Sequence, residues 1–343
     1  MKPITIAGGG LAGLALGIGL RQQGVPVTVF EAGRYPRHRV CGEFISGQGR
    51  AALAELKLEE KMFAAGAREA QTAAFFSRRV NGSPQMLPQP ALCLSRYVLD
   101  RLLADEFQRQ GGILCQEQRW RKTFGDAVVR ATGRRMPDAS NRWRWFGLKV
   151  HARQVRPAAD LEVHLAPQGY VGLCRLNSDE VNICGLFRSR ATVPELAQTW
   201  RNWLSGPDDS VLRQRLAGAE FLEESFCSIA GLQPVAQRDA GHSECRVGDA
   251  ITMIPPLTGN GMSMAFESAA LVTAPIIAYS QGRMTWPETC QEAARRCDRR
   301  FRGRLWRSAW LQNALFHESI ADLLIWLGPR WHGLWRTLFN ETR

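Results

Sequence analysis

Three glycines and one acidic residue near the start of the chain have the spacing of a dinucleotide site. Gly8, Gly10 and Gly13 form the pattern G-x-G-x-x-G, and Glu31 follows 18 residues after the last of them. In such a unit the first glycine forms a tight turn, the second lets a pyrophosphate approach the backbone, and the third lets a helix lie close to a sheet. Backbone amides at the helix start would hold the phosphates, and Glu31 would accept hydrogen bonds from an adenosine ribose.

The elements that must position these residues follow in the expected order. Residues 4–7 and 25–30 are predicted to be short buried strands, and residues 11–23 have the apolar spacing of a helix that ends at Gly24. Because all parts are in register within 31 residues, we favour a binding unit over a glycine-rich turn without a ligand. Glu31 also argues against a 2′-phosphate on the adenosine, since two anions would face each other. FAD and NAD remain as candidates.

Two distant segments favour FAD over NAD. Residues 127–135 read as another short buried strand, which ends at Gly133. Residues 245–276 read as a strand that ends at Asp249, two prolines, and a Gly-Asn-Gly at 259–261 that opens an apolar helix. An acid after a strand can bind a ribityl hydroxyl, and a second helix N-terminus can stabilise negative charge on a reduced flavin. An NAD dehydrogenase has no use for this second loop.

Together these segments resemble the FAD-dependent oxidoreductases related to aromatic hydroxylases and geranylgeranyl reductases. The resemblance covers residues 1–276 in the family's order, and the segment around Gly248-Asp249 is its most specific part. It implies that Arg96, in a helix near 97–110, lies near the phosphate or ribityl chain of the flavin; the alternative is a solvated arginine at a helix start. The residues assigned to FAD are Gly8, Gly10, Gly13, Glu31, Arg37, Cys41, Gly42, Arg96, Gly133, Asp249, Pro256, Gly259, Gly261 and Met262.

A Cys-Gly-Glu segment behind basic residues matches the same group. Its reductases and related halogenases carry a Pro-Arg segment before Cys-Gly-Glu, which here are Pro36-Arg37 and residues 41–43. The resemblance places this loop beside the isoalloxazine ring, where the chain crosses into the substrate domain. Cys41 is therefore one of two candidate catalytic residues, with a small buried residue as the alternative. For Arg37 and Arg39 the alternative is a pair of solvated loop charges.

The chain is predicted to be an α/β protein with a Rossmann-like FAD-binding domain of the GxGxxG type. An inserted, mainly antiparallel β-sheet forms the substrate domain, and a helical segment rich in Arg and Trp ends the chain. Besides the helix near 97–110 we expect a helix over 48–65, a strand over 71–80 and a Pro-rich turn over 82–90. The predicted FAD-binding segments are 1–43, 94–144 and 233–285, those of the substrate domain are 44–93 and 145–232, and the C-terminal segment is 286–343.

The second insertion supplies the other catalytic candidate, Tyr170. It reads as strands over 146–155, 160–176 and 180–190, joined by short turns, with a helix near 194–204. An antiparallel sheet commonly has one free face, which in this family covers the flavin. Tyr170, Val171, Leu173 and Cys184 are candidate pocket residues, but alternation alone does not tell which face each occupies. His151 and His164 have no acid at motif spacing, so we interpret both as structural.

Composition bounds the remaining possibilities. The nine cysteines form no CxxC pair and no ligand cluster with histidine, so neither a metal nor a disulfide framework is predicted, and a reducing cytoplasm is favoured. The net charge of +12 comes without any zinc-finger or RNP-like motif, which argues against nucleic acid as a partner. No uncharged apolar run reaches the ~18 residues of a spanning helix, and the N-terminus lacks a signal-peptide pattern.

The C-terminal segment combines arginines with tryptophans. Cys297, Phe301, Leu305 and Ala309 form an apolar stripe at helical spacing, with arginines on the remaining faces. A helix packed on the FAD-binding domain is one reading, and contact with a membrane surface is the other. Residues 320–328 can equally line or cover the substrate cavity.

Two flavin reactions share this scaffold: oxygen insertion with reduced flavin and O2, and reduction of a carbon–carbon double bond. The prenyl reductases' Tyr-x-Trp-x-Phe-Pro strand is not reproduced in residues 170–175, and the halogenases' Trp-x-Trp-x-Ile-Pro is absent, since residues 143–148 lack its Ile-Pro. We predict an FAD-dependent monooxygenase that hydroxylates or epoxidises a lipophilic or aromatic small metabolite of a biosynthetic pathway. An alkene reductase and a non-catalytic flavin protein are the alternatives. Because there is no second GxGxxG, electrons would come from NAD(P)H that docks transiently or from a separate reductase.

Overall fold

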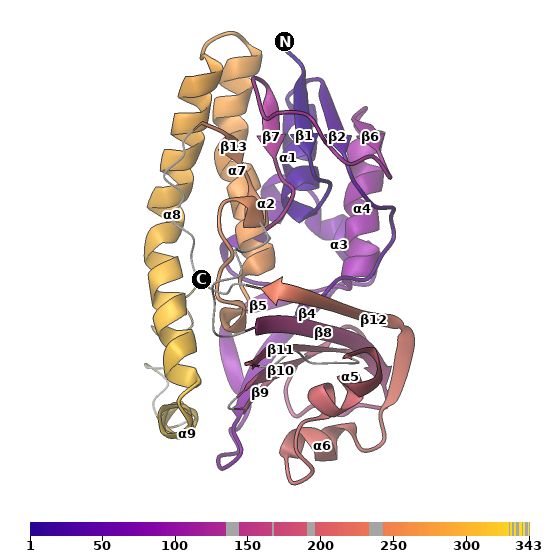
Figure 1. Cartoon of the computed structure of the whole chain (residues 1–343), viewed down its shortest axis with the longest axis vertical. Coiled ribbons are helices and arrows are strands. Elements are labelled where there is room, and N and C mark those ends of the chain that lie inside the picture. The colour runs from indigo at the N-terminus through magenta and orange to yellow at the C-terminus, as the bar shows by residue number, and fades with distance from the viewer. Residues whose placement is uncertain are drawn as a thin grey trace.

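The chain forms two lobes, each built on its own β-sheet (Figure 1). The computed structural model describes residues 1–134, 144–166, 168–190, 196–232 and 243–328, together with residues 330, 333, 336, 337, 339 and 342. The upper lobe contains the N-terminus, and the lower lobe contains the larger sheet. A long helix, α8 (Trp286–Leu315), runs along the side of both lobes.

The upper lobe holds a five-stranded sheet in the order β13-β7-β1-β2-β6, in which every pair is parallel. The short, nearly continuous apolar strands are typical of a sheet covered on both faces. Helices α1 (Leu11–Gln22), α4 (Arg96–Arg109) and α7 (Gly261–Ser280) pack in the same hydrophobic core. This confirms the predicted Rossmann-like domain. Its strands are β1 (Ile4–Ala7), β2 (Val27–Phe30), β6 (Ile113–Cys115), β7 (Val128–Arg130) and β13 (Cys245–Arg246).

The lower lobe holds an eight-stranded sheet in the order β12-β8-β11-β10-β9-β4-β5-β3. It is antiparallel except for the pair β4 and β9, which confirms the predicted sheet type. One face packs on α5 (Leu196–Ser205) and α6 (Val211–Leu216), which lie below it in Figure 1, and the other faces the upper lobe. The strands are β3 (Phe44–Ile45), β4 (Arg68–Phe76), β5 (Gln85–Cys93), β8 (Arg144–Arg153), β9 (Leu161–Ala166), β10 (Gly169–Arg175), β11 (Glu180–Ser189) and β12 (Glu220–Leu232).

Two local predictions in the first insertion were wrong. The Pro-rich segment 82–90, predicted as a turn, belongs mostly to β5. Its prolines are tolerated because the register between β4 and β5 shifts between Ala70 and Thr72, so residues 87–90 lie opposite an irregularity that needs fewer amide donors. The helix predicted over 48–65 is divided into α2 (Gln48–Glu55) and α3 (Glu59–Ala64), since Lys57 adopts a left-handed φ of 57°.

The C-terminal helices begin with a strong helix-start signal. Thr285 and Glu288 form a capping box at the N-terminus of α8, and α9 (Glu318–Leu327) follows a short break. The predicted stripe is only partly correct. Cys297 and Phe301 are buried, but the buried face continues through Arg304 and Ser308 while Leu305 and Ala309 are half-buried. Arg304 is tolerated there because Glu267 of α7 accepts two of its hydrogen bonds, at 2.6 and 3.0 Å.

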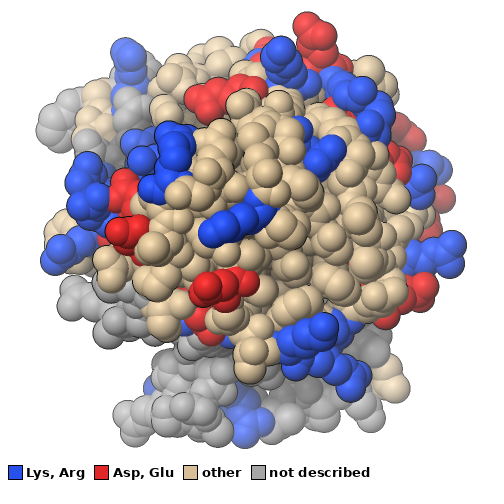
Figure 2. Space-filling model, turned by 90° about the horizontal axis from the view of Figure 1, so that it is seen from above, with Lys and Arg blue, Asp and Glu red and all other residues tan. Residues whose placement is uncertain are grey.

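Helix α7 is the one described helix long and apolar enough to cross a membrane. Of its most apolar window, 61% is buried, and the helix packs against α1, α2 and α8. That environment is typical of a core helix. Viewed from above, the basic side chains of the described residues stand in separate groups with acidic ones between them (Figure 2).

The domain boundaries remain a proposal. The five strands of the upper sheet lie within the segments predicted for FAD binding, whereas β3 begins at Phe44 and β8 begins at Arg144. The boundary at 233 lies outside the described residues. We propose the division predicted from the sequence on the basis of this distribution of strands.

Candidate functional site

The first glycine loop lies at the carboxyl edge of the upper sheet, where ligands of open α/β sheets bind. Gly8 has a φ of 115°, and a Cβ there would lie 2.2 Å from the Ala131 carbonyl oxygen. A Cβ at Gly13 would lie 2.0 Å from the Gly8 carbonyl oxygen. Both positions therefore require glycine for close packing. A Cβ at Gly10 would meet nothing within 4 Å, so the backbone at the start of α1 is open.

Glu31 follows β2 and closes the same edge. Its side chain is nearly buried and accepts hydrogen bonds from the amides of Gly9 and Gly33, at 2.9 and 2.8 Å. Arg37 donates a third, at 2.6 Å. Burial opposes ionisation, but the Gly33 amide and the Arg37 guanidinium outweigh it and lower the pKa of Glu31. A carboxylate offers about four acceptor positions. One position therefore remains on Oε2 for a further donor such as a ribose hydroxyl.

Gly133 and Asp249 follow β7 and β13 at this edge. Gly133 has a φ of 76°, and no atom of the described part of the chain lies within 4 Å of a Cβ built on it. The Asp249 side chain is exposed, yet loss of solvation raises the pKa of its carboxyl against the opposing charges of Arg134 and Arg96. Gly133 and Asp249 therefore lie on the same edge of the sheet as the first glycine loop, and Asp249 is open to solvent there.

A second open helix start lies at α7. Gly261 is exposed, and among the described residues no atom lies within 4 Å of a Cβ built on it and no side chain caps the helix. Asn260 is fully buried, and its Oδ1 has no hydrogen-bond partner among the described residues. The Met262 side chain is buried in the core, so only its backbone amide can serve a ligand. Pro256 begins a short 3-10 helix, and the left-handed Gly259 ends it.

Arg96 ties the Cys-Gly-Glu loop to helix α4. Its side chain is buried and makes a bidentate contact with Asp100, at 2.6 and 2.9 Å, while Arg39 reaches the same carboxylate at 3.2 Å. The alternative interpretation of Arg96, a solvated arginine at a helix start, is thus wrong. Arg37 is paired with Glu31 and Arg39 with Asp100, so neither is a fully solvated loop charge. Gly42 is half-buried in this loop.

The two catalytic candidates lie near each other. Burial raises the pKa of the Cys41 thiol, while the nearby Arg96 acts to lower it. Burial also raises the pKa of Tyr170, and the nearby Cys184 and Cys41 raise it further. Both groups are therefore neutral around pH 7, so Cys41 is not a thiolate nucleophile. The candidate pocket residues separate by face. Tyr170 and Cys184 face the upper lobe, whereas Val171 and Leu173 belong to the core beside α5 and α6 and cannot line a pocket on the free face.

The sequence did not reveal a buried charge network beside this loop. Glu43 is fully buried with a left-handed φ of 60°. Its carboxylate accepts hydrogen bonds from the Arg96 amide at 2.8 Å and from His151 Nε2 at 2.7 Å, and it lies 3.6 Å from Lys149 Nζ. His151 Nδ1 in turn lies 2.6 Å from Glu180. The network joins the loop that carries Cys41 to strands β8 and β11.

Contacts within the network favour the charged forms of Glu43, Glu180 and His151. Burial opposes the charge on Glu43, but His151 and Lys149 outweigh it and lower its pKa. Burial likewise opposes the charge on His151, while Glu180 and Glu43 raise its pKa. His38, 3.0 Å from Lys149 Nζ, has its pKa lowered to about 4 by burial and by Lys149, so it stays neutral.

Both histidines, interpreted from the sequence as structural, contact acids that the fold brings to them. The acids that contact His151 come from a distant loop and from the neighbouring strand, where Asn182 is its register partner. Asn182 also donates to the Cys41 carbonyl at 2.9 Å. His164 lies 2.8 Å from Glu162. Motif spacing could not have found the network around His151; only sheet register brings it together.

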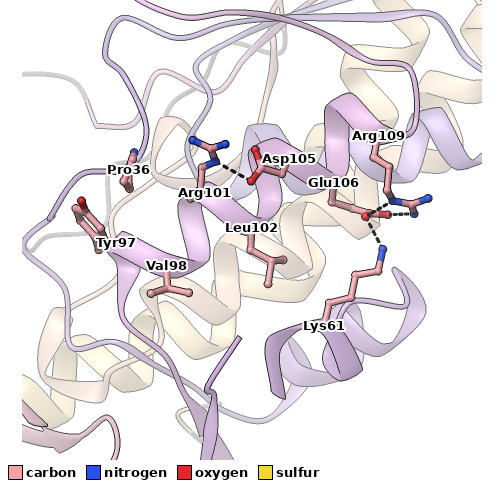
Figure 3. A pocket seen from close by; sticks show the side chains of 9 residues that line it. All are labelled: Pro36, Lys61, Tyr97, Val98, Arg101, Leu102, Asp105, Glu106 and Arg109. Atoms are coloured by element: carbon pink, nitrogen blue, oxygen red, sulfur yellow. Dashed lines mark hydrogen bonds and ion pairs between the residues drawn. The ribbon is translucent and has the colours of Figure 1, made fainter. Parts of the chain in front are cut away.

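A groove on the outer face of α4 lies next to the loop (Figure 3). Its carboxylates are paired within the groove, since Asp105 contacts Arg101 while Glu106 contacts both Lys61 and Arg109. The groove thus offers a ligand no free carboxylate, and we assign it no part in the site. It is lined by Pro36, Lys61, Tyr97, Val98, Arg101, Leu102, Asp105, Glu106 and Arg109. Among the described residues, no cluster of three or more His, Cys, Asp or Glu side chains can hold a metal ion.

The fold is similar to those of several solved flavin-dependent enzymes. No protein-family model and no curated protein sequence matches the chain. It is similar to the flavin-dependent brominase Bmp2, with a TM-score of 0.74 and 16% identity over 99% of this chain and 93% of that chain. For PqsL, a probable FAD-dependent monooxygenase from Pseudomonas aeruginosa, the TM-score is 0.71 and the identity is 14%, over 95% of this chain and 99% of that chain. For the halogenase PltM the TM-score is 0.74 and the identity is 15%, over 99% of this chain and 83% of that chain. The chain therefore has the fold predicted from the resemblance.

Proposed function

We propose that this protein is an FAD-dependent oxidoreductase that oxidises a lipophilic or aromatic small molecule. The observation that carries the proposal is a pair of open helix starts, at Gly10 and Gly261, which no side chain of the described residues caps. Uncapped amides at helix N-termini favour negative charge. A nucleotide with a pyrophosphate in its middle and an electron-accepting ring at one end uses two such sites. The fold shared with flavin-dependent enzymes supports the same group.

The residues of this site fit FAD in chemistry as well as in place. The amides at the start of α1 would hold the pyrophosphate, and Glu31 would accept from the adenosine ribose through its remaining acceptor position. The Asp249 carboxylate would accept a hydrogen bond from a hydroxyl of the ribityl chain. The amides of Gly261 and Met262 would favour negative charge on the flavin ring. Asn260 Oδ1, which has no partner among the described residues, would accept a hydrogen bond from the N–H group of the same ring. When bound, FAD would supply the electron transfer and the activation of O2 for oxygen insertion.

The side chains near Cys41 support an apolar substrate. On the free face of the lower sheet, Tyr170 packs with Phe75, Val163 and Leu257 in one apolar cluster. Both Cys41 and Tyr170 are neutral, so they would exclude water and donate hydrogen bonds without attacking the substrate. A small aromatic ligand, 2-aminobenzoylacetate, is bound in a structure of PqsL. These features favour a neutral aromatic or lipophilic metabolite of a biosynthetic pathway.

The electron donor and the location follow from the same proposal. The described chain carries a single dinucleotide unit, so electrons would come from transiently docked NAD(P)H or from a separate reductase. All nine cysteines are free, which favours a reducing cytoplasm.

A glycine comparison tests the cofactor proposal. The change Gly10→Ala adds a methyl group that meets no protein atom, so the thermal midpoint should match the wild type while FAD affinity falls at least tenfold. Gly218→Ala is the matched control, because its Cβ also meets nothing within 4 Å. FAD binding is measured by quenching of flavin fluorescence. A chain that is colourless and cannot be reconstituted with FAD would refute the proposal, and so would equal affinities in both variants.

Oxygen use tests the reaction. The flavin is reduced under nitrogen with NADH, NADPH or dithionite, and O2 uptake and product mass are then measured with small phenols, aromatic amines and alkenes. Substrate-dependent O2 uptake and a product that gains one oxygen atom support the monooxygenase. Alkene reduction without O2 supports the reductase. Stable flavin binding with no turnover under either condition leaves a non-catalytic flavin protein.

A further inference from the structure

The outer face of helix α8 gathers exposed tryptophans next to unpaired arginines. Trp306 and Trp310 are 71% and 57% exposed, and Trp326 on α9 is 47% exposed. Because Trp normally buries a large apolar area, exposed tryptophans are unusual on a surface that contacts only water. On α9, Ile320 and Leu323 are also exposed. Residues 306–326 therefore hold five of the eleven large hydrophobic side chains that are exposed in the described structure.

Helix geometry places these groups on one stripe. At 3.6 residues per turn, Arg299, Arg302, Trp306 and Trp310 project from the same side of α8. The opposite side is held in place, since Phe301 is in the core and Arg304 contacts Glu267 of α7. The helix cannot rotate to bury the tryptophans without breaking these contacts. Helix α8 itself lies at the edge of the molecule (Figure 1), and all four side chains of the stripe are exposed.

The charge on this stripe is not neutralised within the described structure. Arg299 and Arg302 are exposed and make no ion pair with a described residue. Other arginines of the helix differ, since Arg295 contacts Glu292 and Arg300 contacts Glu267. Between residues 299 and 313 the sequence contains no acidic residue, and the whole chain carries a net charge of +12. The stripe therefore combines apolar rings with positive charge that lacks a counter-ion.

We infer that the α8 stripe, Arg299, Arg302, Trp306 and Trp310, docks on an anionic lipid bilayer. Tryptophan rings partition into the boundary between headgroups and acyl chains, and arginines bind the lipid phosphates beside them. A second copy of the chain fits less well, because pairing two such stripes brings unpaired arginines together without an acid. The inference is independent of the proposed reaction, although a bilayer is a natural source of a lipophilic substrate.

Vesicle sedimentation of the full chain tests the docking. Vesicles of phosphatidylcholine alone are compared with vesicles that contain phosphatidylglycerol, at low and high salt. We expect binding to the anionic vesicles that weakens with salt and is small on phosphatidylcholine. Arg299→Gln with Arg302→Gln should lower the partition coefficient about 30-fold, at about fivefold for each arginine. Trp306→Ser with Trp310→Ser should lower it at least tenfold.

Matched controls separate docking from general effects. Met86→Ser with Ile113→Ser removes side chains that are 64% and 62% exposed but are not part of the stripe, and partitioning should not change. Lys57→Gln removes an exposed positive charge elsewhere. Equal binding to both kinds of vesicle, or equal losses in stripe and control variants, would overturn the inference. So would a dimer by light scattering that the tryptophan changes convert to monomer, or DNA binding lost only with the arginines. FAD content, measured on the same samples, reports separately on the proposed function.

Discussion

Replacing Glu43 by Gln tests whether the buried charge network holds the Cys41 loop on the lower sheet. The change keeps the size of the side chain and an acceptor for the Arg96 amide, but it removes the negative charge. Lys149, which is fully buried, then lies 3.6 Å from a neutral group. Removing one partner of a buried ion pair costs about 3–5 kcal/mol. Because His151 can release its proton and reduce the excess positive charge, we expect the lower end, about 3 kcal/mol.

The assay is urea unfolding at neutral pH, followed by far-UV circular dichroism at one fixed FAD concentration. Glu59→Gln is the matched control, since it breaks the partly exposed contact with Arg50 and should cost about 0–1 kcal/mol. Adding Lys149→Met to Glu43→Gln removes the orphaned charge. The double variant should therefore be less destabilised than the sum of the single changes, by about 1–3 kcal/mol.

Two results would refute this reasoning. If Glu43→Gln costs no more than Glu59→Gln, the buried carboxylate does not stabilise its neighbours. If the two single changes add without coupling, Lys149 does not depend on Glu43 for its charge, and the network is only a set of independent contacts.

Further predictions concern pH, the loop and the C-terminal helix. His151 has a folded pKa above its ordinary value of 6.5, so its contribution is complete below pH 6.5 and is lost as pH rises through the folded value. Glu43 has a folded pKa below 4.5, so its contribution is present above pH 4.5 and is lost as pH falls through the folded value. When urea midpoints are measured between about pH 5 and pH 9, they should therefore decline at alkaline pH, and His151→Gln should make this decline less steep. An unchanged slope in the variant would contradict the raised pKa of His151. Cys41→Ala should retain FAD by absorbance, whereas a large loss of flavin would show that Cys41 is a packing residue and that the loop does not border the ring. Arg304→Met should lower the free energy of unfolding by about 2 kcal/mol, because the buried Glu267 then keeps only its contact with the partly exposed Arg300. Arg295→Met, on the exposed side of the helix, should change it by less than about 1 kcal/mol. Equal effects of the two arginine changes would show that burial does not decide the outcome.

The glycine motif and the parallel sheet could be predicted because their information is local. Gly8, Gly10, Gly13 and Glu31 lie in one continuous unit of strand, helix and strand, where apolar spacing and glycine positions act over a few residues. The antiparallel strands of the second insertion were found for the same reason. Strand β5 was missed, since prolines normally end a strand and only its pairing with an irregular part of β4 tolerates them.

The buried network was beyond prediction from spacing. Glu43 and His151 are 108 residues apart, and Cys41 and Asn182 are 141 apart. Their contact depends on which residues of β8 and β11 face the upper lobe, and a shift of one residue in register would reverse every face. Alternation also left Tyr170 and Val171 equivalent until α5 and α6 occupied one side of the sheet.

By itself, the sequence determined a Rossmann-like unit with a dinucleotide-type glycine loop, an inserted antiparallel sheet and an amphipathic C-terminal helix. These follow from backbone constraints and hydrophobic periodicity, which act between near neighbours in the chain. Only the tertiary structure decided that Tyr170 faces the upper lobe while Val171 does not, that Arg96 is buried against Asp100, and that Glu43 anchors a buried charge network. These properties depend on packing, on solvation and on charges brought together across the fold, and none of these is encoded in the spacing of residues along the chain.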